Sequence, residues 1–228
     1  MTNTVKSLVF IVSLFIFLGL YVLAVDVINL FAGSMTGLTV LILTAVSLMA
    51  AYIIMLYSQA LVKRWYIKRQ LQDTNIILKL AMPPFKFSER LITYIFPVLA
   101  VFIPLFRGNA LSASSLISVV CLVILIIIVE ILFYLNSKTM HAYITNKGIA
   151  IMGFDTRFEL SLPLNYSNVS GFYSFERLDS FLAFPDRVIV YNLFDSSVMT
   201  IMCGSEESKQ IKALFIANGV PEKKLQGM

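Results

Sequence analysis

The chain has 228 residues, of which 58% are hydrophobic and 14% are charged, whereas soluble domains average about 45–50% and about 25%. This composition excludes an ordinary soluble globular protein and indicates a membrane protein. The net charge of +5 lies wholly in residues 63–90, which carry seven cations and two anions. Because that excess sits between apolar runs, it indicates membrane orientation and argues against nucleic-acid binding.

Four charge-poor runs are candidate membrane spans: residues 8–31, 38–62, 91–106 and 110–135. A spanning helix needs about 20 residues, whereas the third run has only 16 and contains Pro97 and Pro104. We expect it to span, with Arg107 reaching the interface; a re-entrant half-helix is the alternative. The first run is too long for the apolar part of a signal peptide.

Four spans would place both chain ends on one side, and the basic segment assigns that side to the cytoplasm of a bacterial inner membrane. The chain then divides into four regions: a first transmembrane hairpin (1–62), a basic amphipathic linker (63–90), a second hairpin (91–139) and a cytoplasmic domain (140–228).

The linker predicts a surface helix over residues 63–82, ended by Pro83-Pro84. Its apolar residues with helical spacing are Ile67, Leu71, Leu78 and Met82. Four cations gather at its start: Lys63, Arg64, Lys68 and Arg69. Beside Trp65 and Tyr66, these cations are expected to contact anionic lipid. They serve either as a topology anchor or as a specific lipid-binding or partner-docking site.

Asp26 and Glu130 are the carboxylates inside the apolar runs, and such residues are costly enough to be functional candidates. Asp26 lies near the outer end of its run and Glu130 near the inner end. We expect each to face the membrane interface, or to pair with Arg107 and with a cytoplasmic lysine respectively; an ion or proton role and a partner contact are the alternatives. Small residues in the second and fourth runs favour close packing, including a homo-oligomer, over a pore.

From Met140 the pattern changes to short β-prone runs. Predicted strands cover residues 141–145, 149–152, 157–162, 169–175, 187–194 and 198–202. Asn146-Lys147-Gly148 is a hairpin turn because Asn and Gly tolerate positive φ. A helix follows, with Ser205 as its N-cap and Asn218-Gly219 at its end.

Residues 143–149, 162–169 and 187–191, followed by the terminal helix, resemble the bacterial PH-like domains of small polytopic membrane proteins, including the YcxB-like group. The resemblance implies a split barrel with a C-terminal helix and a role in binding. The expected fold is therefore an α-helical membrane bundle of four transmembrane helices followed by a small α+β domain. The domain's zero net charge favours a protein ligand over a phosphoinositide.

Catalytic patterns are missing from the sequence. His141 is the only histidine, which argues against multi-histidine metal sites and most triads. Cys121 and Cys203 lie on different predicted segments and form no CxxC pair. We therefore expect no enzyme activity, no cofactor and no metal. Membrane lipids and a protein are the expected partners.

The best candidate for partner binding is an apolar group flanked by charges, formed by Phe181, Leu182 and Phe184. The function expected is that of an accessory or regulatory membrane protein. One alternative is a self-protection factor, such as bacteriocin immunity or conjugative entry exclusion. The other is a transporter or channel component.

Overall fold

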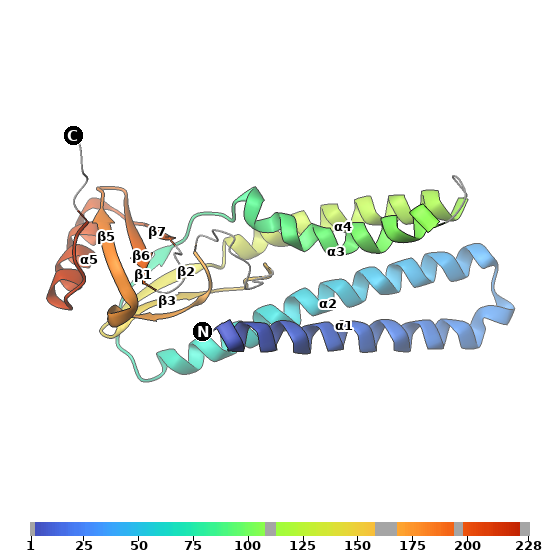
Figure 1. Cartoon of the computed structure of the whole chain (residues 1–228), viewed down its shortest axis with the longest axis horizontal. Helices are drawn as coiled ribbons and strands as arrows, with labels where there is room; N and C mark the ends of the chain where they lie inside the picture. Colours follow the sequence, from blue (N-terminus) through green and yellow to red (C-terminus); the bar gives the residue numbers. More distant parts are fainter. Residues whose placement is uncertain (1–2, 108–112, 158–167, 194–197, 224–228) are drawn as a thin grey trace.

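The structure, a computed structural model, describes residues 3–107, 113–157, 168–193 and 198–223. Long helices lie at one end of an elongated molecule and a β-domain at the other (Figure 1). The long helices are α1 (Asn3–Phe31), α2 (Gly37–Leu71), α3 (Phe87–Arg107) and α4 (Ala113–Ser137). Among the described residues, three segments are long and apolar enough to cross a membrane: Ser7–Ser34, Gly37–Leu71 and Leu116–Ser137.

The first two helices form an antiparallel hairpin through the short helix η1 (Ala32–Ser34), far from the β-domain (Figure 1). Thr36 caps α2, because its hydroxyl accepts from the Thr39 amide at 3.3 Å. The 35 residues of α2 make a helix about 52 Å long, well beyond a ~30 Å hydrocarbon core. Its last turns therefore extend to the β-domain.

The linker differs from the prediction of one helix over residues 63–82. Helix α2 ends at Leu71, and residues 76–81 form strand β1 (Ile76–Ala81). Strand β1 pairs antiparallel with β2 (His141–Thr145), with Leu80 opposite Ala142. The second helical hairpin is thus inserted between the first two strands of one sheet.

The β-domain consists of two antiparallel sheets. One has the order β1-β2-β3-β4, with β3 at Gly148–Met152 and β4 at Gly171–Ser174. The other has the order β5-β6-β7, at Leu178–Ala183, Arg187–Asn192 and Val198–Met202. Strand β5 was not predicted, and residues 158–167, which include most of one predicted strand, lie outside the described part of the chain.

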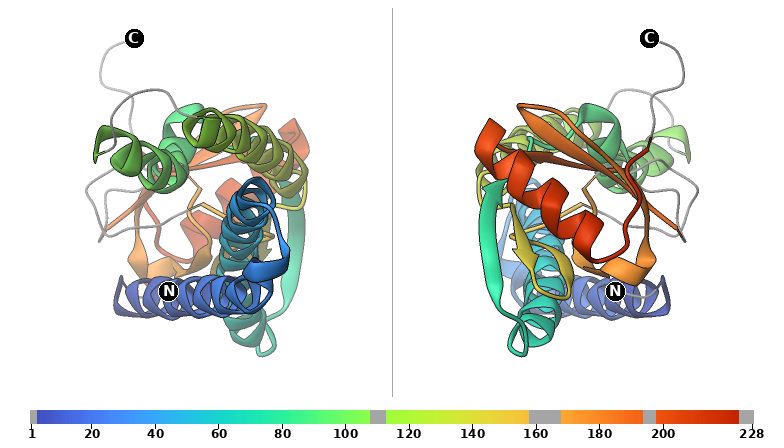
Figure 2. Two further views of the ribbon diagram at one scale, coloured as in Figure 1. Left: turned by 90° about the vertical axis from the view of Figure 1, so that its right-hand side faces the viewer. Right: turned by 90° about the vertical axis from the view of Figure 1, so that its left-hand side faces the viewer.

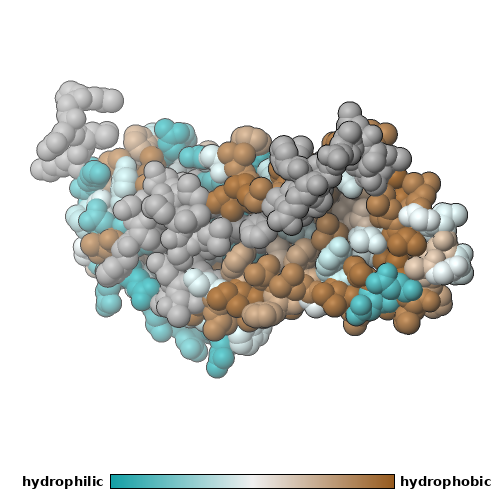
Figure 3. Space-filling view, turned by 45° about the vertical axis from the view of Figure 1, so that its right-hand side comes forward, coloured by the Kyte–Doolittle hydropathy of each residue, from teal (hydrophilic) through white to brown (hydrophobic). Residues whose placement is uncertain are grey.

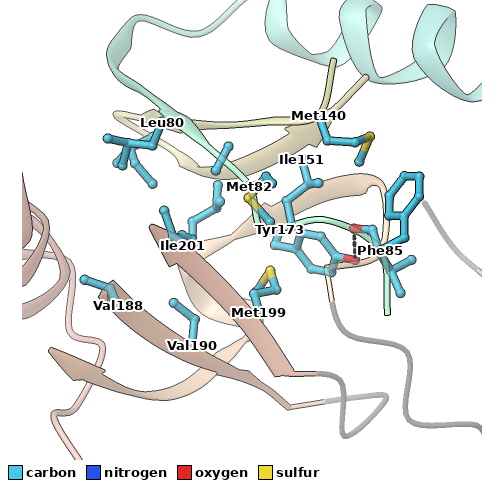
Figure 4. Close-up of a cluster of buried hydrophobic side chains, with 14 of the residues drawn as sticks. Leu80, Met82, Phe85, Met140, Ile151, Tyr173, Val188, Val190, Met199 and Ile201 are labelled. Carbon is cyan, nitrogen blue, oxygen red and sulfur yellow. Dashed lines mark hydrogen bonds between the residues drawn. The ribbon is translucent and has the colours of Figure 1, made fainter. Parts of the chain in front are cut away.

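Apolar side chains of the two sheets point toward one another and form the domain core (Figure 4). Leu80 and Ile151 come from the first sheet, and Val190 and Ile201 from the second; all are buried. At the β2–β3 turn, a Cβ on Gly148 would lie 2.1 Å from the carbonyl oxygen of Tyr173. Only glycine fits there, as the hairpin prediction requires.

Helix α5 (Ser205–Ala217) lies across the end of the domain that is farthest from the long helices (Figure 2). Its Phe215 ring packs edge-on against Phe181, with centroids 5.2 Å apart. The N-cap is Gly204, one residue before the predicted Ser205, and its amide donates to the Glu207 carboxylate at 2.7 Å. Beyond the helix, the Lys223 amide donates to the Phe181 carbonyl at 2.8 Å, which covers the free edge of β5.

Hydropathy divides the surface in the same way as the fold. Hydrophobic side chains gather over the helical part of the molecule, whereas hydrophilic ones gather over the β-domain (Figure 3). Exposed apolar residues continue along α1 and α4, as expected for helices that face lipid.

The pairing of β1 with β2 can be tested by disulfide formation between Lys79→Cys and Tyr143→Cys, whose parent residues are opposite one another in the register. The background lacks the two native cysteines, Cys121 and Cys203. We expect the pair to oxidise readily, detected by a gel shift after cleavage of the chain between them. The control pair Lys79→Cys and Lys147→Cys is four residues out of register and too distant to bridge. Equal oxidation of both pairs would contradict this strand pairing.

Candidate functional site

Four charged side chains meet where the helices join the β-domain. We call them the junction cluster: Lys63 of α2, Glu89 of α3, and Asp155 and Arg157 of the segment after β3. Each is at most 3% exposed. Buried charges of this kind occur in proteins only when they are paired. The formal charges of the two cations and two anions cancel.

Arg157 is the centre of the junction cluster. Its guanidinium holds Asp155 with two bonds, from Nε to Oδ1 and from Nη2 to Oδ2, each 2.8 Å long. Nη1 donates to Glu89 Oε2 at 2.8 Å, and Nη2 also donates to the Asn168 carbonyl at 2.9 Å. The guanidinium lies 4.1 Å from the centroid of the Phe85 ring. This planar, fork-shaped recognition is specific to arginine.

Lys63 joins the cluster from α2, where its ammonium donates to the carbonyl oxygen of Arg157 at 3.1 Å. Burial alone would raise the pKa of Asp155, but the charges of Arg157 and Lys63 outweigh burial and hold that pKa well below its usual range. The Ser170 hydroxyl also donates to Asp155 Oδ2 at 2.8 Å. Asp155 is therefore a permanent anion at physiological pH.

Local sequence explains how α2 and α3 supply their charges. Glu89 lies in the first turn of α3 and accepts the Lys86 amide at 3.2 Å, the position at which an acidic side chain caps a helix. Lys63 follows Gln59 by one turn and precedes Ile67 by one turn, on a buried stripe of α2. Both charges thus project from ordinary helical positions.

The fourth helix reaches the same segment. The Asn136 side-chain amide donates to the Thr156 hydroxyl at 3.3 Å, and the Thr139 hydroxyl accepts the Phe154 amide at 2.9 Å. Residues 154–157 therefore bond to α2, α3 and the end of α4. We call these four residues the docking segment.

Apolar contacts reinforce the docking. The buried core runs without interruption from α2 and α4 into the domain, with Phe85 packed edge-on against Phe133 at 6.1 Å. Separately, Ile67 and Leu71 at the end of α2 pack against Ala150 of β3. Two contact regions, one after the other along the buried stripe of α2, fix the orientation of the domain relative to the bundle.

Of the four predicted lipid-contact residues, one is buried and three are exposed. Lys63 is buried in the junction cluster, so the expectation that it faces lipid is wrong. Arg64, Lys68 and Arg69 are exposed. The amphipathic face of Ile67 does exist, but its apolar side meets the β-sheet because the chain returns there as β2 and β3.

The predicted aromatic patch is also divided. Phe181 is fully buried against Phe215, so its expected exposure is wrong. It alternates inward on β5, the strand that the sequence did not reveal. Leu182 and Phe184 are half-buried, and the Arg187 guanidinium lies 5.3 Å from the centroid of the Phe184 ring.

The two intramembrane carboxylates lie far apart. Glu130 of α4 is paired with Arg90 of α3 and accepts the Tyr94 hydroxyl at 2.5 Å, so its partner is an arginine of the neighbouring helix and not the expected lysine. Asp26 is exposed, near the end of α1 that leads into η1. The side chain of Arg107, its expected partner, lies outside the described residues.

Sequence reasoning missed Glu89, Asp155 and Arg157 as a unit. They are 68 residues apart at the widest hydrogen bond, and a charge gives no local sign that it is buried. One signal was present: Lys63 and Ile67 share a helical face, which predicts that Lys63 points toward whatever buries Ile67.

The site holds fixed ion pairs, which suits positioning rather than reaction chemistry. Across the described ranges, no three His, Cys, Asp or Glu side chains converge to hold a metal ion. His141, at the start of β2, contacts the Thr139 carbonyl through Nδ1 at 2.9 Å. Comparison of the chain with protein-family models, curated proteins and solved structures finds no match.

Arg157→Met should destabilise the protein by about 3–5 kcal/mol, because it leaves two carboxylates buried without their main partner. The measurement is urea unfolding in detergent micelles, followed by the fluorescence of Trp65, the only tryptophan. The control is Arg187→Gln, which removes an exposed arginine 3.9 Å from Asp186 and should cost less than about 1 kcal/mol. Equal losses in the two variants would refute the role of the junction cluster.

Proposed function

We propose that the chain is a non-enzymatic, four-span protein of a bacterial inner membrane, whose cytoplasmic PH-like domain binds a protein partner. The domain is carried in a fixed orientation against the inner membrane face. The observation that carries the proposal is a mostly apolar outer face on the sheet β5-β6-β7, on the side opposite the core.

The path of the chain supports four spans. Strands β1 and β2 are hydrogen-bonded neighbours, so the end of α2 and the end of α4 lie on the same side of the membrane. If α4 crosses the membrane, its start lies on the opposite side. The chain leaving β1 must then cross before α4 begins, and α3 is the helix available to do so.

Strand and helix order support the PH-like assignment. Sheets of four and three antiparallel strands face one another, and a single helix closes the end of the domain. These are the features that the sequence resemblance implies. The first strand, however, comes from the linker before α3, so the domain is built from two separated parts of the chain.

Alternating burial along β6 defines the outer sheet face. Val188 and Val190 point into the core and are fully buried, whereas Ile189 and Tyr191 point outward and are half-buried, with the Lys223 ammonium 4.3 Å from the centroid of the Tyr191 ring. The outer sheet face consists of the apolar Leu182, Ile189, Tyr191, Val198 and Met202 and the polar Ser180, Arg187 and Thr200. An antiparallel sheet with one face in water normally alternates apolar and polar residues. A mostly apolar outer face instead favours burial by a partner.

This placement refines the predicted partner site. Leu182 lies beside Ile189 in the register, and Val198 lies beside Tyr191. Phe184 follows β5 in the turn to β6, next to Arg187. The binding surface proposed is therefore the outer sheet face with Phe184 at its end, and Phe181 contributes to its rigidity from the core.

Photo-crosslinking in the native membrane tests partner binding. A photoreactive phenylalanine analogue at position 189 should give one discrete adduct with a different protein, identified by mass spectrometry. The same analogue at position 213, exposed on α5, should give none, and Tyr191→Asp should abolish the adduct at 189 without unfolding the domain. Adducts only between two copies of the chain, or equal yields at both positions, would contradict the proposal.

The four-span topology predicts a labelling pattern for single cysteines in a background without Cys121 and Cys203. Ser34→Cys and Asn109→Cys should react with a membrane-impermeant maleimide on spheroplasts. Gln72→Cys, just beyond α2, should react only after lysis. Protection of position 109 in intact spheroplasts, with labelling of position 34, would show that α3 does not cross.

A further inference from the structure

The inner ends of α2 and α4 present exposed cations that the junction cluster does not use. Arg64 and Lys68 lie one turn apart on α2, and Lys138 follows the end of α4. Within the described ranges none of these three takes part in an ion pair, whereas Arg90 and Arg157 are paired with carboxylates. These three cations therefore give the inner ends of α2 and α4 an excess of positive charge. We call this region, together with Phe154, the seam.

Phe154 of the docking segment connects the two sides of the seam. The Arg64 guanidinium lies 4.8 Å from the centroid of its ring. The Phe154 amide donates to the hydroxyl of Thr139, the residue next to Lys138, at 2.9 Å. An arginine stacked on a ring keeps the edges of its guanidinium available for a bidentate anion. Half-buried Phe154 thus contacts Arg64 through its ring and bonds beside Lys138 through its backbone, while the Lys138 ammonium lies 4.2 Å from the centroid of the Tyr134 ring.

Hydrogen bonds fix the seam at one depth. Lys63 bonds to the Arg157 carbonyl and Asn136 bonds to Thr156, so residues 63–64 of α2 and 136–138 of α4 lie at the same level. Just there, two aromatic residues, Trp65 and Tyr134, are each 61% exposed. Exposed Trp and Tyr of a membrane protein favour the headgroup layer.

On the bundle side of these cations, the exposed side chains of α2 and α4 are apolar. Leu61 and Val62 precede the cations on α2, and Ile131 precedes Lys138 on α4; all three are exposed apolar side chains. Cations therefore stand at the headgroup level, directly above surface suited to acyl chains. An acidic protein would match the charges, but it would leave this adjoining apolar surface unexplained.

We propose that the seam formed by Arg64, Lys68, Phe154 and Lys138 binds the headgroup of an anionic phospholipid. The phosphate would receive the guanidinium of Arg64 and the ammonium of Lys138, while the acyl chains lie along α2 and α4. The site is independent of the outer sheet face. It replaces the buried Lys63 of the sequence prediction with Lys138. It also gives a role to Arg64, Lys68 and Lys138, the exposed cations at the ends of α2 and α4 that form no ion pair within the described ranges.

Native mass spectrometry of the detergent-purified full chain, titrated with phosphatidylglycerol or phosphatidylcholine, tests the seam. Wild type should bind phosphatidylglycerol preferentially. The double variant Arg64→Gln with Lys138→Gln should bind it about 30-fold more weakly, from about fivefold per basic residue. The control, Lys209→Gln with Lys212→Gln, removes the same charge from α5 at the outer end of the domain (Figure 1) and should keep the preference.

Two further measurements guard against a folding defect in the seam variant. The charge-conserving double variant Arg64→Lys with Lys138→Arg should retain most of the preference, and 1 M salt should remove it from wild type. Equal binding of phosphatidylglycerol by wild type and the seam variant would overturn the proposal. So would binding of polyglutamate at the seam without any preference for phosphatidylglycerol, which would make the seam a protein-docking surface.

Discussion

A buried guanidinium must find anionic partners, and Arg157 takes one from its own segment and one from the start of α3. This requirement holds the β-domain against the helices. Ion pairs of this kind add little net stability over apolar packing, yet they strongly penalise any arrangement that separates the partners. The junction cluster therefore specifies one orientation of the domain. The apolar contacts of α2 and Phe85 then supply packing around it.

The order of segments along the chain strengthens this attachment. Strand β1 precedes α3 and pairs with β2, which follows α4. The second helical hairpin is therefore an insertion between two neighbouring strands of the sheet. The domain cannot swing on a single tether as a C-terminal appendage would. The proposed binding surface on β5-β6-β7 and the proposed lipid site at the helix ends are consequently held in fixed relation to one another.

The apolar runs, the turn at Gly148 and the closing helix could be predicted because each has a local signal in period or turn chemistry. The linker could not. Leu78, Leu80 and Met82 alternate as in a strand, but Leu78 and Met82 also fit a helical spacing with Ile67. Only the distant partner β2 decides between the two readings. The junction cluster stayed hidden for the same reason, since its charges become neighbours only after the chain folds.

The central claim is that the domain and the membrane bundle form one rigid unit held by the junction cluster. Electron–electron distance measurements in lipid nanodiscs test it directly, with spin labels at Val62→Cys on α2 and Lys209→Cys on α5, both exposed positions. The predicted result is one narrow distance distribution in a chain that lacks the free Cys121 and Cys203 and is otherwise wild type, and this distribution broadens when Arg157 is replaced by Met. A broad or multimodal distribution before that replacement would contradict the account.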